Sequence, residues 1–297
     1  MKFLDKRTGK TAPRKLRELL AGDRIILGGG AHDALSARIV EQTGYELCVV
    51  TGAGVSMCRG YPDVGFVSGE EMVSNARYVA EAVSIPVIVD ADNGYGNAMN
   101  VMRTVREFER AGVAGLHIED QVTPKRCGHM AGKQVIPAAE MAGKIRAALD
   151  ARRDPDFVII ARCDALMVEG LQATLDRGDA YVEAGADMLF IEMRESLEEI
   201  QIIARHFRGR ALLHWNHSPS GMVPRLSVSE IEAMGFKTAC FYVHALMAAC
   251  KTMREVLTEI RQTGNSLTVW DRMVDFNDFW QIGRLDEVRE MEKKYGE

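Results

Sequence analysis

The chain has 297 residues, 47% of them hydrophobic, and a formal net charge of −5 with a pI near 5.9. A chain of this size can bury a large core as one or two domains, and its acidic balance gives no support to a nucleic-acid or anionic-membrane partner. The first residues have no apolar core of signal-peptide length, and no apolar run approaches the length of a membrane span. The six cysteines show neither CxxC pairs nor a disulfide-framework density. We therefore expect a cytoplasmic protein with reduced thiols.

Short apolar strands alternate with amphipathic helices along the whole chain. We predict strands at residues 24–27, 47–50, 86–89, 115–118, 157–161, 188–191, 211–213 and 237–242. We predict helices at residues 12–20, 34–42, 70–83, 98–111, 138–152, 171–184, 197–206, 228–234, 245–261, 269–280 and 285–294. This alternation indicates parallel βαβ units, and eight strand–helix pairs are the number that closes a (β/α)₈ barrel.

An open, doubly wound sheet is the alternative fold. However, the turn at residues 28–33 lacks the G-x-G-x-x-G spacing of a dinucleotide-binding fold. In a barrel the carboxyl ends of all strands meet at one mouth, and seven polar residues follow six of the predicted strand ends. These residues are Thr51, Asp90, Asp92, Glu119, Arg162, Glu192 and Asn216. We predict an α/β protein in which residues 1–297 form one TIM-type barrel domain, with residues 243–297 as a helical C-terminal extension.

The polar segment after Glu119 is the strongest candidate for a catalytic loop. It places Lys125, Arg126, Cys127 and His129 within five positions, and Gly128 among them lets the backbone approach a ligand. Neighbouring cations lower the cost of a thiolate, which marks Cys127 as a reactive group. A solvated surface connection is the alternative interpretation.

The acids at the third and fourth strand ends suggest a metal site. Asp90 and Asp92 are two residues apart and can project to one side, and Glu119 follows the next strand. Carboxylates that meet without a cation repel one another, and an oxygen-rich, thiolate-poor set suits Mg²⁺, or Mn²⁺. Alternatively, Asp92 only forms a turn and a helix cap.

Three further groups are candidates for substrate binding. Arg162 has no obvious local partner and suits a bidentate grip on a carboxylate, unless it forms a buried ion pair with Glu192. The turn at residues 51–54 offers a hydroxyl and backbone N–H groups to an anion, although small residues also simply allow a tight turn. Asn216 and Ser218 complete a second polar pocket or are ordinary loop residues.

These motifs resemble the isocitrate lyase/phosphoenolpyruvate mutase superfamily over nearly the whole chain. The most specific matches are residues 125–129 (KRCGH) and 117–121 (HIEDQ). Residues 87–97, residues 159–166 and the pair Pro62-Asp63 also match at the expected intervals.

The resemblance implies a (β/α)₈ barrel whose eighth helix is swapped to a neighbouring subunit of a homotetramer. It implies Mg²⁺ at Asp90 and Asp92, with Asp63 and Glu119 contributing mainly through water, and a gating loop around residues 121–135. It assigns proton donation to Cys127, and we place Lys125, His129, Arg162 and Glu119 in the same catalytic set. It assigns substrate binding to Thr51, Gly52, Ala53, Arg162, Glu192 and Asn216. From their own positions we add Gly128 and Ser218 to this set.

Three departures from the family pattern affect the substrate. Val49 stands where the methylisocitrate lyases have tyrosine, and Thr51 replaces their serine. Ala248 stands where they have an arginine, and residues 216–221 depart from their usual stretch. Without that arginine a tricarboxylate would leave one buried carboxylate unpaired, which favours a smaller dicarboxylate. The general base that removes the hydroxyl proton is left open.

The leading hypothesis is a Mg²⁺-dependent carbon–carbon lyase that cleaves a 2-hydroxy dicarboxylate of substituted-malate or methylisocitrate type to a 2-oxoacid and a carboxylate. Phosphorus–carbon bond chemistry, as in carboxyphosphonoenolpyruvate phosphonomutase, is the first alternative, and oxaloacetate hydrolysis is the second. A catalytically silent barrel that only binds or assembles is a further alternative. The intact acids and the intact loop at residues 125–129 argue against it.

Overall fold

The computed structural model describes residues 9–128 and 130–296. The chain divides into two compact units, one covering Thr11–Val243 and the other containing the helices from His244 onward. The boundary lies next to the start of the predicted C-terminal extension.

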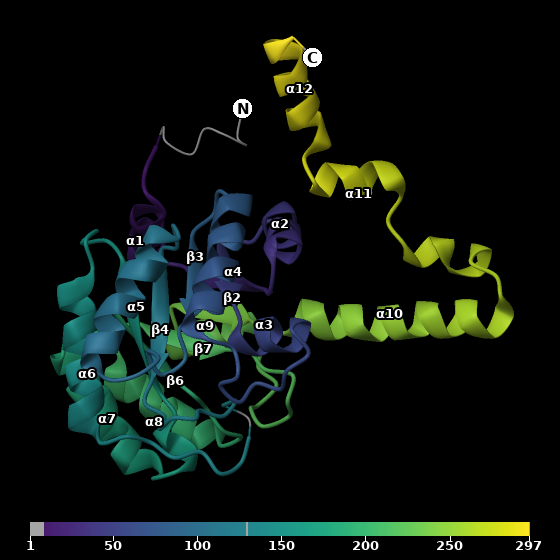
Figure 1. Cartoon of the computed structure of the whole chain (residues 1–297). Helices are drawn as coiled ribbons and strands as arrows, with labels where there is room; N and C mark the ends of the chain where they lie inside the picture. The colour runs from purple at the N-terminus through teal and green to yellow at the C-terminus, as the bar shows by residue number, and fades with distance from the viewer. Residues whose placement is uncertain (1–8, 129, 297) are drawn as a thin grey trace. The chain divides into compact units, whose positions relative to one another are not determined.

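Eight parallel strands form a closed barrel, in which each strand pairs with the next and β8 pairs with β1 (Figure 1). The strands are β1 (Ile26–Ala31), β2 (Leu47–Val50), β3 (Val87–Asp90), β4 (Gly115–Glu119), β5 (Val158–Cys163), β6 (Met188–Ile191), β7 (Leu213–Asn216) and β8 (Thr238–Phe241). Closure leaves no exposed sheet edge, and all eight carboxyl ends face one mouth. The predicted TIM-type barrel is therefore confirmed.

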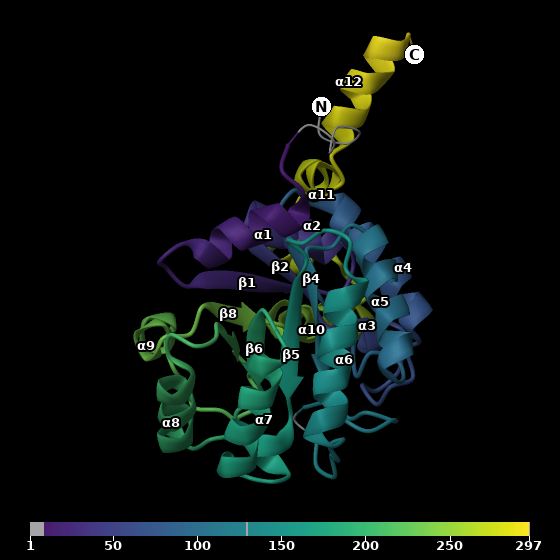
Figure 2. The ribbon, with the colours of Figure 1, turned by 90° about the vertical axis from the view of Figure 1, so that its left-hand side faces the viewer.

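Helices connect the strands and cover the outside of the barrel (Figure 2). They are α1 (Ala12–Ala21), α2 (Ala34–Gln42), α3 (Gly52–Cys58), α4 (Gly69–Ala82), α5 (Ala98–Arg110), α6 (Ala138–Ala151), the short 3₁₀ helix η1 (Ala165–Met167), α7 (Leu171–Glu183), α8 (Leu197–Phe207) and α9 (Val228–Met234). Several begin with a side-chain cap, such as Ser68 at α4 and Asn97 at α5, which satisfies free backbone N–H groups.

Buried side chains form two cores. The larger core lies between the strands and their covering helices and contains outward-facing strand residues such as Leu116 and Ile159. The smaller core fills the barrel interior with inward-facing residues such as Val49 and Ile160, and includes Leu16 of α1. Because Leu16 packs with these interior residues, α1 helps to close the barrel opposite the mouth.

Two predicted boundaries near the first two strands were wrong. We expected the first strand to stop at residues 28–30, but β1 continues to Ala31, and a Cβ at Gly28 would lie 2.4 Å from Cys240 Sγ. The first helix predicted after the second strand begins at residue 70, but α3 starts already at Gly52. The glycines of β1 are therefore close-packing positions rather than a turn.

The second unit is entirely helical. It contains α10 (His244–Thr263), the 3₁₀ helix η2 (Leu267–Arg272), α11 (Phe276–Ile282) and α12 (Leu285–Tyr295). The single helix predicted at residues 269–280 was wrong, because η2 ends at Arg272 and Asp275 caps a separate helix. Within the described ranges, no helix is both long and apolar enough to cross a membrane.

Candidate active site

Four carboxylates gather at the mouth of the barrel. Asp90 ends β3, Asp92 follows it, Glu119 ends β4, and Asp63 comes from the segment after α3; all four are buried. The backbone N–H of Asp92 donates to Asp90 Oδ1 over 3.0 Å, which orients the Asp90 carboxylate. Asn97, not Asp92, caps α5, so the helix-cap interpretation of Asp92 was wrong.

Asp92 has an unusual backbone conformation. Its φ is +46°, in the left-handed region that residues other than glycine rarely adopt. Gly94 (φ +84°) and Tyr95 (φ +58°) follow in the same region. Strained backbone of this kind persists where the surrounding structure enforces it, most often at functional sites.

The ammonium group of Lys125 lies among these acids. Its Nζ contacts Asp63 Oδ1 and lies 2.8 Å from Asp92 Oδ1, and the side chain is almost fully buried. Burial alone would lower the pKa of Lys125, but Asp92, Asp90, Glu119 and Asp63 together raise it well above its ordinary value. Lys125 is therefore a charged counter-ion inside the cluster.

One cation does not balance the cluster. Burial, followed by the charge of Asp90, raises the pKa of Asp92 to about 7. Burial likewise raises the pKa of Glu119 well above its ordinary value, despite the nearby Arg162. Glu119 Oε1 is buried and accepts no hydrogen bond from the described residues. An unsatisfied, desolvated carboxylate oxygen is costly and indicates a place for a further positive group.

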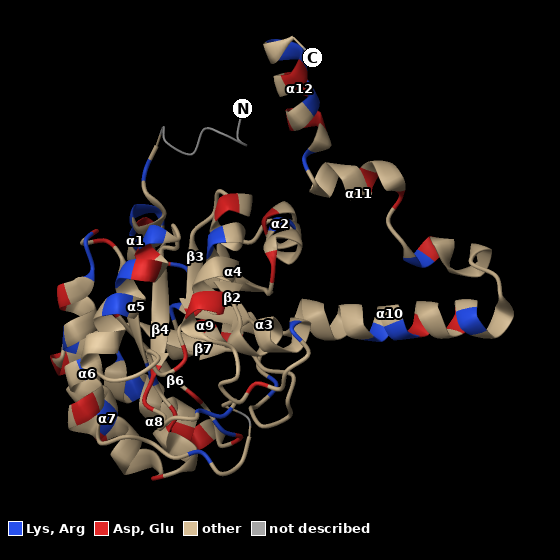
Figure 3. Cartoon of the chain, viewed as in Figure 1, with Lys and Arg blue, Asp and Glu red and all other residues tan. Residues whose placement is uncertain are grey.

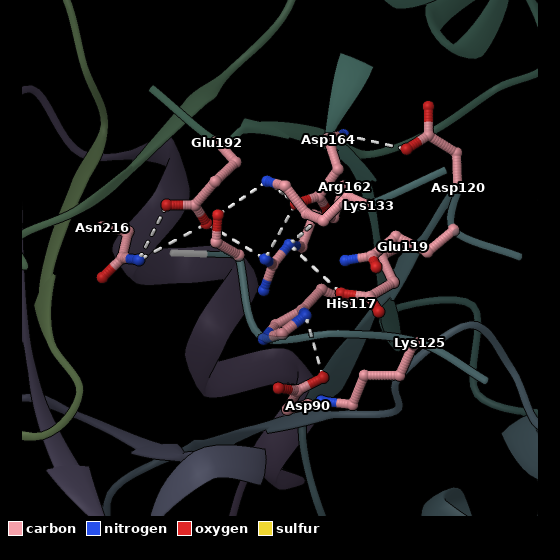
Figure 4. A network of polar contacts seen from close by, with 12 residues as sticks. Asp90, His117, Glu119, Asp120, Lys125, Lys133, Arg162, Asp164, Glu192 and Asn216 are labelled. Carbon is pink, nitrogen blue, oxygen red and sulfur yellow. Dashed lines mark hydrogen bonds and ion pairs between the residues drawn. The ribbon is translucent and has the colours of Figure 1, made fainter. Parts of the chain in front are cut away.

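Arg162, at the mouth end of β5, joins a second set of carboxylates (Figure 4). Its Nε and Nη2 donate to Asp164 over 2.9 and 3.2 Å, and Nη2 lies 3.1 Å from Glu192 Oε2. Its Nε also lies 3.4 Å from Glu119 Oε2. The expectation that Arg162 lacks a local partner was wrong, and the ion pair with Glu192 exists. Among the described residues, however, Nη1 donates no hydrogen bond.

The loop that carries Cys127 lies over this cluster. The backbone N–H of Cys127 donates to Asp63 O over 3.1 Å, and Gln121 bonds both the N–H and the carbonyl of Arg126. At Gly128 an added Cβ would lie 2.4 Å from Arg162 Nη2 and 2.9 Å from the Glu192 carboxylate. Only glycine allows the backbone to come this close.

The small-residue segment after β2 lies beside the acids. Thr51 caps α3 by accepting from the Gly54 N–H, and a Cβ at Gly52 would lie 2.7 Å from Asp90 Oδ2. The N–H groups of Gly52 and Ala53 belong to the first turn of α3 and have no intrahelical acceptor. They are therefore available to an anion next to Asp90.

A chain of aromatic polar groups forms the floor of the site. His117 Nδ1 lies 3.5 Å from Asp90 Oδ1, and Tyr242 Oη lies 3.5 Å from His117 Nε2 and 2.9 Å from His214 Nε2. His214 Nδ1 in turn lies 2.8 Å from Thr238 Oγ1. Burial lowers the pKa of His117 to about 4 and also holds the pKa of His214 well below its ordinary value, so both rings are neutral.

The donor set at the mouth fits a hard divalent cation. It consists of carboxylate oxygens, contains no thiolate, and includes the unsatisfied Glu119 Oε1. As the described residues stand, no three His, Cys, Asp or Glu side chains are spaced to hold a metal ion. Lys125 Nζ lies between Asp63 and Asp92 instead. A divalent ion bound at these acids would therefore neutralise carboxylate charge that the Lys125 ammonium group now neutralises.

Charged residues also gather in the loops at the carboxyl ends of the strands (Figure 3).

Residues 16–261 match the family described as phosphoenolpyruvate phosphomutase. The chain belongs to this family. The 2,3-dimethylmalate lyase of Eubacterium barkeri is 43% identical over 282 residues, which cover 95% of this chain and 97% of that one. A 2-methylisocitrate lyase of Aeropyrum pernix is 40% identical over 267 residues, covering 90% and 85%.

A crystal structure of 2,3-dimethylmalate lyase, described as a member of the PEP mutase/isocitrate lyase superfamily, superposes with a TM-score of 0.91. It is 35% identical and the match covers 97% of this chain and 96% of that one. The resemblance inferred from the sequence motifs is thus confirmed, and the protein is an enzyme, a lyase of this superfamily.

In the structure, most of the predicted site residues lie close together at the mouth of the barrel. Asn216 Nδ2 reaches Glu192 over 3.4 Å, which joins β7 to the Arg162 set. Ser218 accepts from the Ser220 N–H within its own loop, and it makes no hydrogen bond to the acids among the described residues. His129 lies outside the described residues. The roles assigned to individual side chains stay predictions.

Several residues of the site were not predicted from the sequence, among them Asp164, Lys133, His214 and Tyr242. Asp164 follows Arg162 by two positions, which is a weak local signal for the ion pair between them. Lys133, His214 and Tyr242 gave no such signal, because their partners are distant in the sequence and only the folded chain brings them near.

Proposed function

We propose that the protein is a Mg²⁺-dependent carbon–carbon lyase that cleaves a 2-hydroxy dicarboxylate of substituted-malate type to a 2-oxoacid and a carboxylate. The supporting observation is the charge of the mouth. Three buried cations, Lys125, Lys133 and Arg162, face six buried carboxylates, which are Asp63, Asp90, Asp92, Glu119, Asp164 and Glu192. A dianionic substrate could not enter such a site without a further cation.

The residues that would hold Mg²⁺ are Asp90 and Asp92, with Glu119 and Asp63 close by. When bound there, the ion supplies Lewis-acid stabilisation of the oxygen that becomes negative as the carbon–carbon bond breaks. The N–H groups of Gly52 and Ala53 donate to the same fragment beside Asp90, and one well-placed donor of this kind contributes roughly 3–4 kcal/mol.

Arg162 binds a substrate carboxylate through Nη1, the guanidinium nitrogen that no described residue uses. Asp164 and Glu192 hold its other nitrogens, so the free one has a fixed direction. Cys127, on the loop above, delivers a proton to the carbanion-like fragment after cleavage. Its backbone is held by Asp63, and the covering loop excludes water during this step.

The site favours a substrate smaller than methylisocitrate. Arg162 already serves three carboxylates of the protein, and Ala248 stands where related lyases carry a further arginine. A third substrate carboxylate would therefore lack a cationic partner, at a cost of several kcal/mol. Malates with alkyl substituents need no such partner.

The decisive experiment is a substrate panel. The purified protein with Mg²⁺ is incubated with alkyl-substituted malates, methylisocitrate, oxaloacetate and phosphonopyruvate-type compounds, and pyruvate, glyoxylate, other 2-oxoacids, oxalate and phosphate are measured. We expect cleavage of a substituted malate and no turnover by Cys127→Ser. Oxalate from oxaloacetate alone would favour the hydrolase, and processing of phosphonates alone would favour phosphorus–carbon chemistry.

The metal proposal predicts that Asp92→Asn binds Mg²⁺ about 100-fold more weakly than the wild type, because one charged ligand is lost from a buried site. Isothermal titration calorimetry measures this without any substrate. Asp150→Asn, an exposed carboxylate on α6, is the control. Equal affinities of Asp92→Asn and the wild type would place the ion elsewhere.

We also propose that the protein assembles as a homotetramer through the helices from His244 onward, with the eighth helix swapped between subunits. None of the residues of α10 is buried within the chain, although the helix carries Met247, Met253 and Leu257. Exposed apolar side chains at helical spacing are typical of a face that packs on another subunit.

A further inference from the structure

Lys133 is a buried lysine that the proposed chemistry does not use. It follows the Cys127 loop, and its side chain is only 2% exposed. Its Nζ donates to Asp164 Oδ1 over 2.8 Å and to the carbonyl of Gly128 over 2.6 Å. Burying an ammonium group is costly unless its hydrogen bonds are satisfied, so these two bonds determine where the Lys133 side chain lies.

The first partner, Asp164, is fixed to the barrel. It follows β5, its carboxylate accepts two hydrogen bonds from Arg162, and its N–H donates to Asp120 Oδ1 over 2.8 Å. Asp120 in turn accepts from Tyr181 Oη of α7 over 2.6 Å. Asp164 is therefore a rigid attachment point that also orients Arg162.

The second partner, Gly128, is the residue next to Cys127. Its backbone lies against Arg162 and Glu192, with no room even for a methyl group. The Lys133 ammonium thus joins the backbone beside the thiol to the carboxylate that orients Arg162. Removing it would leave the Gly128 carbonyl and one Asp164 oxygen without this donor.

We propose that Lys133 is a positioning residue whose ammonium group, by bridging Gly128 O and Asp164, holds the backbone at Cys127 against the Arg162 cluster. This rests on the proposed function only where turnover is concerned. The proposed ordering of the Cys127 backbone by Lys133 does not depend on which bond the enzyme cleaves. A lysine that only neutralises Asp164 would not change the mobility of the Cys127 backbone.

The test compares backbone amide exchange of residues 121–135 in the wild type and in Lys133→Met by mass spectrometry. We expect exchange of this segment to become about tenfold faster or more, because two charge-assisted hydrogen bonds are lost. Lys237→Met is the matched control. Lys237 is also a buried lysine, and its Nζ also donates to two groups, the carbonyls of Gly22 and Arg24 at the opposite end of the barrel.

Unchanged exchange of residues 121–135 in Lys133→Met overturns the proposal. If the methionine variant does not fold, Lys133→Gln, which keeps a donor without the charge, is measured in its place with the same expectation. In an Asp164→Asn background the Lys133 substitution should add little to the exchange rate, whereas a full additional effect also contradicts the bridge.

A second readout separates this proposal from the proposed function. With a substrate that the panel identifies, kcat of Lys133→Met should fall by tenfold or more, while Lys237→Met keeps the wild-type value. If the wild type cleaves none of the panel, the amide-exchange comparison still decides the role of Lys133.

Discussion

His214 is a buried imidazole whose protonation the fold disfavours. It is fully buried, and its two nitrogens lie within hydrogen-bond distance of Thr238 Oγ1 and Tyr242 Oη. Burial lowers its pKa well below 6.5, so the folded protein cannot take up the proton that the unfolded chain binds below about pH 6.5. The contribution of neutral His214 to the free energy of unfolding is therefore complete above about pH 6.5 and decreases as the pH falls below it.

We predict that the free energy of unfolding of the wild type decreases between pH 6.5 and 5, and that His214→Leu removes about 1.4 kcal/mol per pH unit from this slope. Urea unfolding at a series of pH values measures it. The slope, not the absolute stability, is compared, because leucine also deprives Tyr242 and Thr238 of a partner. His206→Gln on α8 controls for loss of a histidine elsewhere, and equal slopes in His214→Leu and the wild type would contradict the prediction.

The candidate site could be predicted from the sequence wherever a residue directly follows an apolar strand. Asp90, Glu119 and Arg162 could be found in this way, because strand ends in a barrel converge whatever the helices between them. Lys133 could not, because its partner Asp164 is 31 positions away and only the folded loop brings them together. Contacts of this kind depend on the path of a loop, which strand and helix periodicity does not describe.

At the scale of elements, the three glycines of β1 show how packing can overrule local sequence signals. A run of glycines typically marks a turn. In β1, however, an added Cβ at Gly30 would lie 1.9 Å from the carbonyl oxygen of Tyr242, and one at Gly29 would lie 2.6 Å from Val40. Glycine is used here because β8 and α2 come close to the strand, and no local pattern reveals that approach.

We predict that Gly30→Ala lowers the free energy of unfolding by about 3 kcal/mol or more, or prevents folding, because the methyl group would meet backbone rather than a movable side chain. Thermal unfolding followed by circular dichroism measures the effect. Gly143→Ala on α6 is the control, since its Cβ would meet nothing closer than 4.0 Å. A wild-type melting temperature for Gly30→Ala would show that β1 and β8 are not packed this closely.

At the scale of the whole molecule, the helices from His244 onward bury far fewer apolar side chains than the helices of the barrel. The barrel helices α4 and α5 bury several apolar side chains, whereas α10 and α12 have no buried residue within the chain. The first part of α10 carries no charged residues (Figure 3). In addition, Phe276 and Trp280 of α11 are 78% and 49% exposed. Such an apolar segment is expected to be covered in the assembled protein.

Met253 and Leu257 are four residues apart on α10 and share one face, with exposed fractions of 53% and 65%. If this face packs on another subunit, Leu257→Asp places a charge in an apolar interface and also loses about 1.5–3 kcal/mol of burial per subunit. We predict that sedimentation velocity finds a tetramer for the wild type and smaller species for Leu257→Asp at micromolar concentration. Thr258→Asp, a neighbouring exposed position turned away from that face, should leave the tetramer intact. A wild type that sediments as a 32.9-kDa monomer would contradict the assembly, and an unchanged tetramer in Leu257→Asp would place the interface elsewhere.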